Sequence, residues 1–164
     1  MEERRPNRRQ RRKSEAGTQD RIEPTLVAFL ICRSAGRSDD GSHNITGIFD
    51  GLTATAVVPP GSSPDLSTLA VPVQFVLFTR WVGGSGIFKQ WIDVTGPDQA
   101  VQSTDEVDFW LRDQFKAHNV ITRVNLGAKE GVYYFDVKLD GKSRGRIPLK
   151  VKFEIIRPTA PQQT

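Results

Sequence analysis

Residues 131–151 read GVYYFDVKLDGKSRGRIPLKV, and this stretch decides the fold class. Apolar and polar residues alternate on both sides of Asp140-Gly141, which is the period of a β-strand with one buried face. Asp-Gly is favoured at the positive φ angles of tight hairpin turns. The sequence therefore predicts an antiparallel hairpin with strands at 133–140 and 147–156, and with residues 142–145 lengthening its loop.

Further strands extend outward from this hairpin. Residues 25–33 are a short apolar run, 86–95 alternate, and 69–81 are the most hydrophobic strand, which predicts a central position. Pro72 cannot donate to a ladder, so that end of its strand should lie at an edge or a bulge. The predicted loops are rich in Gly, Ser, Asp and Pro and comprise residues 34–42, 59–67 and 83–86.

Two stretches are less regular. Gly47 and Gly51 interrupt the β pattern of residues 44–58, which predicts a bulge or a sharp bend that can carry the strand from one sheet to the other. Residues 106–115 fit a strand, but a short amphipathic helix fits them as well. About eight strands and at most one short helix predict an all-β fold, an antiparallel β-sandwich.

The two ends of the chain differ from this body. Residues 1–24 hold almost nothing to bury and predict a disordered, arginine-rich tail, followed by a sandwich domain at 25–157 and a frayed tail at 158–164. Of 23 basic and 19 acidic residues, eight basic and four acidic ones lie in 1–21, which leaves fifteen of each for the rest. The net charge of +4 therefore belongs to the tail, and the body is formally neutral.

The residues that commonly carry catalysis are scarce. We expect Cys32 to be a buried small hydrophobe, because its strand is apolar. We expect His43 and His118 to be solvated loop histidines, and no serine has the spacing of a nucleophile elbow. One cysteine and two distant histidines do not predict a zinc site. We therefore predict no catalytic residues, no cofactor and no metal.

Acidic residues leave two hypotheses open. Calcium could be bound by Asp39-Asp40 or by Asp93 with Asp98, although aspartates that simply begin turns explain the same pattern. Asp50 lies in a β pattern that disfavours aspartate. It is either a residue that caps the backbone at a bulge or a pocket acid.

The tail offers a polyanion-binding hypothesis, because arginine pairs with phosphate and releases counterions. Glu2, Glu3 and Glu15 dilute its charge, and no aromatic residue is interleaved for base stacking. The candidate binding residues are Arg4, Arg5, Arg8, Arg9, Arg11, Arg12 and Lys13.

Three segments resemble an uncharacterised bacterial family, a domain of unknown function. They are LVAFLIC with NITGIFDGLTA (within 26–54), the apolar strand 69–78 with WIDVTGPD (91–98), and the hairpin 131–151. The resemblance spans about residues 25–152. It implies a small β-sandwich in a bacterial cytoplasm, and it implies neither an activity nor functional residues. The arginine-rich tail has no counterpart in the family pattern.

The function expected from these observations is a non-catalytic binding module, not an enzyme, whose loops or sheet edge engage an unknown protein or small ligand. The alternative is a nucleic-acid-associated or capsid-like assembly protein that uses the basic N-terminal arm. No apolar run is long enough to span a bilayer, so we expect a cytoplasmic protein without membrane contact. The oligomeric state stays open.

Overall fold

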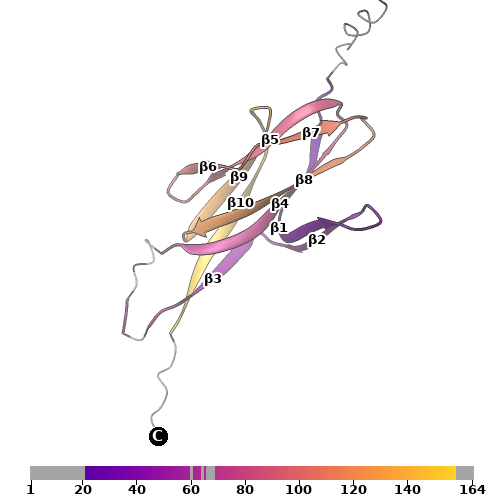
Figure 1. Ribbon diagram of the computed structural model, residues 1–164. Helices are drawn as coiled ribbons and strands as arrows, with labels where there is room; N and C mark the ends of the chain where they lie inside the picture. The colour runs from indigo at the N-terminus through magenta and orange to yellow at the C-terminus, as the bar shows by residue number, and fades with distance from the viewer. Residues whose placement is uncertain (1–20, 60, 64, 66–68, 158–164) are drawn as a thin grey trace, which may run out of the picture.

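The structure, a computed structural model, describes residues 21–59, 61–63, 65 and 69–157. These residues form ten β-strands and no helix, which confirms the predicted all-β fold (Figure 1). The strands are β1 (Thr25–Arg37), β2 (His43–Ile48), β3 (Gly51–Val57), β4 (Val71–Val82), β5 (Gly86–Thr95), β6 (Val101–Ser103), β7 (Val107–Leu111), β8 (His118–Ala128), β9 (Gly131–Leu139) and β10 (Lys142–Ile156). The part of the chain that is described offers no helix long and apolar enough to cross a membrane. Both predicted tails, 1–24 for all but its last four residues and 158–164, lie outside the described residues.

The strands form two sheets, one with the order β2-β1-β4-β8 and one with the order β3-β10-β9-β5-β6, where β7 also pairs with β5. Every pair is antiparallel except β3 with β10. Side chains from both sheets meet in one core, for example Phe75 of β4 and Phe135 of β9, whose rings make an edge contact at 5.5 Å. The predicted sandwich is therefore confirmed.

The β9–β10 hairpin turns on Asp140 and Gly141 alone, with φ angles of 47° and 85°. Lys142 already pairs with Leu139, so the expectation that residues 142–145 lengthen the loop was wrong. The extra residue is instead absorbed by a register shift between Ser143 and Gly145. A two-residue turn with two positive φ angles matches the twist of its strands, and a bulge lets the strands pair up to that turn.

The chain crosses between the sheets at the predicted bend, because β2 belongs to one sheet and β3 to the other. Gly47 has a φ of 64°, and a Cβ there would lie 3.0 Å from that of Arg33. The Phe49 amide donates to Ile31 of β1 at 3.1 Å, whereas the Asp50 carbonyl accepts from Lys150 of β10 at 3.1 Å. Consecutive residues thus bond to different sheets, and β3 arrives beside β10 in the same direction.

The ambiguous stretch 106–115 contains a strand, β7, and no helix. Phe109 and Leu111 are buried while Trp110 is exposed, which is the two-residue alternation of a strand with one buried face. Phe109 packs between the rings of Trp81 and Phe88, at 6.1 and 5.7 Å. That burial is available to a strand along the edge of β5 but not to a helix with a period of 3.6.

The β1–β2 hairpin curls back over the outer face of its sheet. Strands lie about 4.8 Å apart, so in a flat sheet β2 would be about 14 Å from β8. Yet His43 of β2 lies 3.0 Å from the Asn119 amide of β8, and its ring contacts Phe78 of β4. This cover buries a second apolar cluster of Cys32, Val76 and Phe78, as expected for the cysteine.

The same hairpin corrects the predicted loop at 34–42. Strand β1 continues to Arg37, and only residues 38–42 connect it to β2. The Gly- and Ser-rich composition of residues 34–37 suggested a loop, but pairing with β2 along Ser34–Arg37 satisfies their backbone.

Strand β4 is central, as predicted, between β1 and β8. Its pairing with β1 ends at Val76, so Pro72 has only β8 as a neighbour, opposite Gly127. Pro148 of β10 likewise lies before the pairing with β3 begins at Lys150. Each proline occupies a position where one side of its strand is open, and a missing N–H costs no ladder bond there.

One buried polar side chain joins the two sheets. The Oε1 atom of Gln90, on β5, accepts hydrogen bonds from Thr79 Oγ1 at 2.8 Å and from Trp81 Nε1 at 2.6 Å, both on β4. All three side chains are buried in the core. A single carbonyl thus satisfies two donors of the opposite sheet.

We predict that Gln90→Leu lowers the free energy of unfolding by about 2–4 kcal/mol, because it leaves two buried donors without an acceptor. Urea unfolding followed by tryptophan fluorescence measures this change. The control is Gln74→Leu, the same substitution at an exposed position of β4, which should change stability by less than about 0.5 kcal/mol. Equal stability of the two variants would contradict the role given to Gln90.

Candidate functional site

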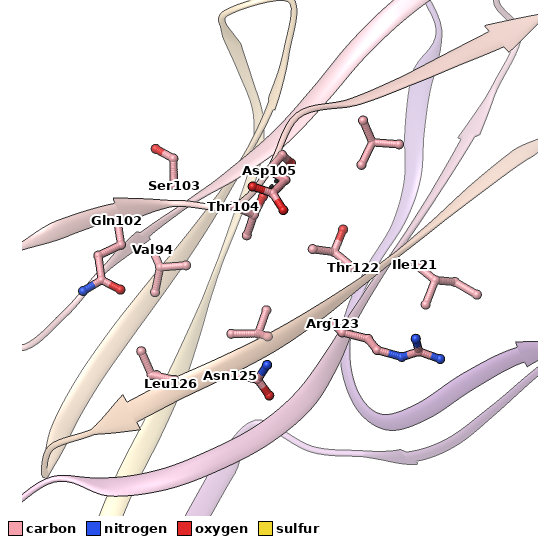
Figure 2. Close-up of a pocket in the computed structure, with 12 residues that line it drawn as sticks. Val94, Gln102, Ser103, Thr104, Asp105, Ile121, Thr122, Arg123, Asn125 and Leu126 are labelled. Atoms are coloured by element: carbon pink, nitrogen blue, oxygen red, sulfur yellow. Dashed lines mark hydrogen bonds between the residues drawn. The ribbon is translucent and has the colours of Figure 1, made fainter.

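A groove of about 400 Å³ lies where the two sheets part. Figure 2 shows Gln102, Thr104 and Asp105 on the wall that the six-stranded sheet provides, and Thr122 and Asn125 on β8. The floor is apolar, with Val94, Val107, Val124 and Leu126 from both sheets. A groove with an apolar floor and polar walls suits a ligand that has one apolar and one polar face.

The groove exists because the strand that borders β5 is split in two. Strand β7 pairs with β5 as far as Gln90, and β6 pairs with it from Asp93 onward. Between them Thr104 takes the place of a strand. Its amide donates to the carbonyl of Ile92 at 2.9 Å, and its Oγ1 accepts from the Ile92 amide at 3.0 Å. The backbone of β5 is thereby satisfied while the edge stays interrupted.

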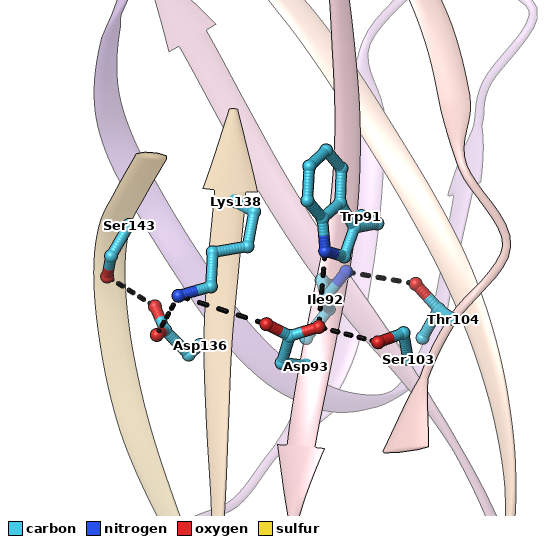
Figure 3. A network of polar contacts seen from close by, with 8 residues as sticks. All are labelled: Trp91, Ile92, Asp93, Ser103, Thr104, Asp136, Lys138 and Ser143. Atoms are coloured by element: carbon cyan, nitrogen blue, oxygen red, sulfur yellow. Dashed lines mark hydrogen bonds and ion pairs between the residues drawn. The ribbon is translucent and has the colours of Figure 1, made fainter. Parts of the chain in front are cut away.

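A polar network on the outer face holds β6 to the sheet (Figure 3). Asp93 accepts from Ser103 Oγ at 2.7 Å and from the Trp91 indole at 3.1 Å. Lys138 Nζ lies 3.8 Å from Asp93 and 2.7 Å from Asp136. Burial by itself would raise the pKa of Asp136, but hydrogen bonds from Lys138 and Ser143 outweigh it and lower that pKa. Asp136 is therefore ionised at neutral pH, and the contacts of Asp93 hold β6 in place as part of the wall.

The opposite wall is the free edge of β8. This strand pairs with β4 along its whole length, from Trp81↔His118 to Val71↔Ala128. Among the described residues no strand pairs with its other side. Close to His118 that side is covered by β7, since the rings of His118 and Phe109 stack at 4.8 Å. Residues 121–126 face the groove, and an unpaired edge carries backbone donors and acceptors in need of partners.

Asp50, the described residue among the site residues proposed from sequence, does not line this groove. Asp50 is exposed at the crossing between the sheets, where its backbone carbonyl bonds Lys150. Its side chain borders a shallow depression together with Lys150 and Lys152. The basic residues proposed for polyanion binding, Arg4 to Lys13, lie outside the described residues.

Three of the four aspartates considered for calcium are held by other groups. Asp98 pairs with Lys129 at 3.0 Å, which lowers the pKa of Asp98. Asp93 belongs to the network with Lys138, and Asp40 accepts from the amide and hydroxyl of Ser42. Within the described part of the chain, no group of three or more His, Cys, Asp or Glu side chains could hold a metal ion.

The histidines are not the solvated loop residues expected from sequence. His43 begins β2 and His118 begins β8, and both are half-buried. Burial lowers the pKa of His118. The sequence did not predict the burial of the two histidines, because their neighbours in the chain are polar. The apolar partners, Phe78 and Phe109, come from other strands.

Of the loops considered for binding, 83–86 is occupied by the chain itself. Ile22 and Ser85 exchange backbone hydrogen bonds of 3.0 and 2.9 Å, so the residues that enter β1 cover this turn. The loop 59–67 is described only in part.

A family model matches residues 27–152, its description being a family of unknown function, DUF6941. The chain belongs to DUF6941. This confirms the family resemblance seen in the sequence. No curated protein matches the chain. The match extends from β1 into β10, so both walls of the groove lie inside the DUF6941 region.

Sequence reasoning missed the groove of this DUF6941 domain. Its residues are ordinary strand residues, and the opening arises from the way two edges face each other. The available signal was the loss of alternation at residues 103–106, between the patterns of β6 and β7. For residues 106–115 the sequence left a strand and a helix open, and it predicted no interrupted edge.

We predict that the stability of the domain falls as the pH is lowered through about 6.5. The folded pKa of His118 lies below the ordinary value of 6.5, so the unfolded chain binds the proton more readily in this window. The contribution is complete above the unfolded pKa and is lost as the pH falls toward the folded one. Urea unfolding at about four pH values between 5.5 and 7.5 should show that the free energy of unfolding increases with pH.

His118→Phe keeps an aromatic ring against Phe109 but cannot be protonated. Its stability should depend less on pH than that of the native chain over the same window. A variant with the native slope would show that other groups produce it.

Proposed function

We propose that this DUF6941 domain is a non-catalytic binding module that takes an extended peptide segment of a partner protein on the free edge of β8. The observation that supports this most is the unpaired stretch 121–126 facing the groove. A strand added to a sheet edge gains affinity from main-chain hydrogen bonds and specificity from alternate side chains.

The groove-lining edge of β8, residues 121–126, is six residues long and can therefore pair with a bound segment of about six residues. Such a segment spans about 20 Å when extended. Alternate side chains of such a segment would contact the apolar floor at Val107, Val124 and Leu126. The others would meet the polar rim, which carries Asp105 on one wall and Arg123 on the other. We therefore expect ligands in which apolar and polar residues alternate.

The non-catalytic part of the proposal rests on the same lining. Its titratable side chains are one carboxylate, Asp105, and one guanidinium, Arg123. General acid–base chemistry commonly needs a pair of groups with separated pKa values, and an always-charged guanidinium cannot serve as the second. A bacterial cytoplasmic setting, which the family resemblance suggests, belongs to this proposal as well.

We predict that Thr122→Lys abolishes peptide binding and leaves the fold intact. Thr122 is partly exposed on the groove side of β8, and lysine at an edge blocks the addition of a strand. The probe is the best binder from a display library of random peptides of about twelve residues, twice the expected contact length. Its affinity for the variant should fall more than about tenfold by calorimetry.

Thr55→Lys is the matched control, because Thr55 is exposed on β3, another edge strand, and borders no groove. This control should bind like the native chain. Peptide binding should also slow the hydrogen exchange of amides within 121–126. Failure of the library to yield a binder, or equal binding by Thr122→Lys, would refute strand addition at β8.

A second candidate function, nucleic-acid association, is favoured by the layout of charge. The strands of the four-stranded sheet contain four arginines and no carboxylate, namely Arg33, Arg37, Arg80 and Arg123. The segment 4–13 carries seven further basic residues that would add phosphate contacts to those of these arginines. Arginine contacts to phosphate give affinity without sequence specificity.

For this second candidate we expect that replacing the seven basic residues of 4–13 by glutamine weakens binding of a single-stranded oligonucleotide and flattens its salt dependence. Each lost phosphate contact should reduce the slope of log K against log salt by about 0.7. Fluorescence anisotropy over a salt series measures both quantities. Unchanged affinity and slope would remove the tail from this function.

A further inference from the structure

A second depression, of about 640 Å³, lies at the end of the sandwich where the tip of the β1–β2 hairpin meets the start of β8. It shares no lining residue with the groove beside β8. It forms because the hairpin curls over the outer face and brings His43 against Asn119. We name it the hairpin pocket.

Three cationic side chains from separate segments line the hairpin pocket. They are Arg37 at the end of β1, Arg80 of β4 and Lys116 in the connection between β7 and β8. No carboxylate is among the lining residues. Bringing three positive charges together is unfavourable unless a counter-ion lies between them.

None of these three cations has an ion-pair partner within the described residues, although ion pairs are common elsewhere. The paired cations are Arg21, Lys89, Lys129, Lys138 and Arg144. Each of these lies in the six-stranded sheet or in the segments that adjoin it. The ion pairs of the described structure therefore neutralise some cations of that sheet and its adjoining segments, whereas none of them involves the three cations of the hairpin pocket.

Two carboxylates in the neighbouring turns bond within their own turns. Asp40 accepts from the amide and hydroxyl of Ser42 at 2.9 and 2.7 Å, and Asp113 accepts from the Phe115 amide at 2.8 Å. Asp39 stands on the hairpin turn but does not line the pocket. The hydrogen bonds from Ser42 lower the pKa of Asp40, so this local arrangement persists at neutral pH.

The remaining wall is polar and held in place. The Asn119 amide donates to His43 Nδ1 at 3.0 Å, and the His43 ring contacts Phe78. His118 stacks on Phe109. The Asn119 Oδ1 atom is buried and has no hydrogen-bond partner among the described residues. The cations thus surround a wall that the packing of other strands keeps rigid.

We propose that the hairpin pocket binds the phosphate group of a small phosphate monoester. Guanidinium groups present planar forks of N–H donors that match the oxygens of a phosphate, and an ammonium adds a point charge. The pocket volume lies within the range of small-molecule sites and exceeds what one oxyanion fills. The remainder of the monoester occupies that space. This inference does not depend on the proposed peptide binding in the groove beside β8.

The test uses the full chain, with inorganic phosphate and ribose 5-phosphate as probes at constant ionic strength. We expect both probes to shift the NMR signals of the Asn119 side-chain amide and of the Arg37 and Arg80 Nε–H groups. Ribose 5-phosphate should bind more tightly than inorganic phosphate. In the double variant Arg37→Gln with Arg80→Gln, affinity for ribose 5-phosphate should fall at least about tenfold.

Arg112→Gln is the matched control, since Arg112 is an exposed arginine directly after β7 and does not line the pocket. It should retain native affinity. If the double variant does not fold, Lys116→Gln alone, in an exposed connection, should still weaken binding. Equal losses in Arg112→Gln and the pocket variants would overturn the proposal, as would shifts confined to residues 1–20. Ribose 5-phosphate binding no more tightly than inorganic phosphate would overturn the choice of a monoester.

Discussion

The carbonyl of Gln90 is the polar contact on which the relation between the two sheets depends. It accepts from Thr79 and from the Trp81 indole across the core, where apolar packing alone would tolerate small displacements of one sheet against the other. Hydrogen bonds are directional, so this contact specifies one relative position of β4 and β5. Trp81 in turn sets the place of Phe109, and Phe109 that of His118.

Both surfaces to which we assign binding arise where the sheets end. The peptide groove opens because the edge of β5 is covered by two short strands with Thr104 between them. The hairpin pocket forms because β1 continues beyond the last residue that pairs with β4 and curls back together with β2. In each case an irregular edge of a sheet creates the concave surface, while the buried core lies between the two sheets.

The neutral charge of the body conceals an uneven distribution. The strands of the four-stranded sheet carry arginines without carboxylates, whereas every ion pair of the described residues has at least one member in the other sheet or its connections. Formal charge sums over the chain, but a ligand responds to the field at one face. The neutral net charge of the body therefore did not predict an anion site there, whereas the basic composition of the tail predicted one in the tail.

The sequence by itself determined the all-β class, the hairpin at Asp140-Gly141, the central position of β4, the crossing after Gly47 and the burial of Cys32. These follow from local periodicity, turn chemistry and backbone freedom, which act between neighbours in the chain. Only the tertiary structure decided that residues 34–37 are strand, that residues 107–111 are not helix, and that His118 is half-buried. It also decided both binding surfaces, because pairing and packing bring together residues whose separation in the chain carries no signal of their contact.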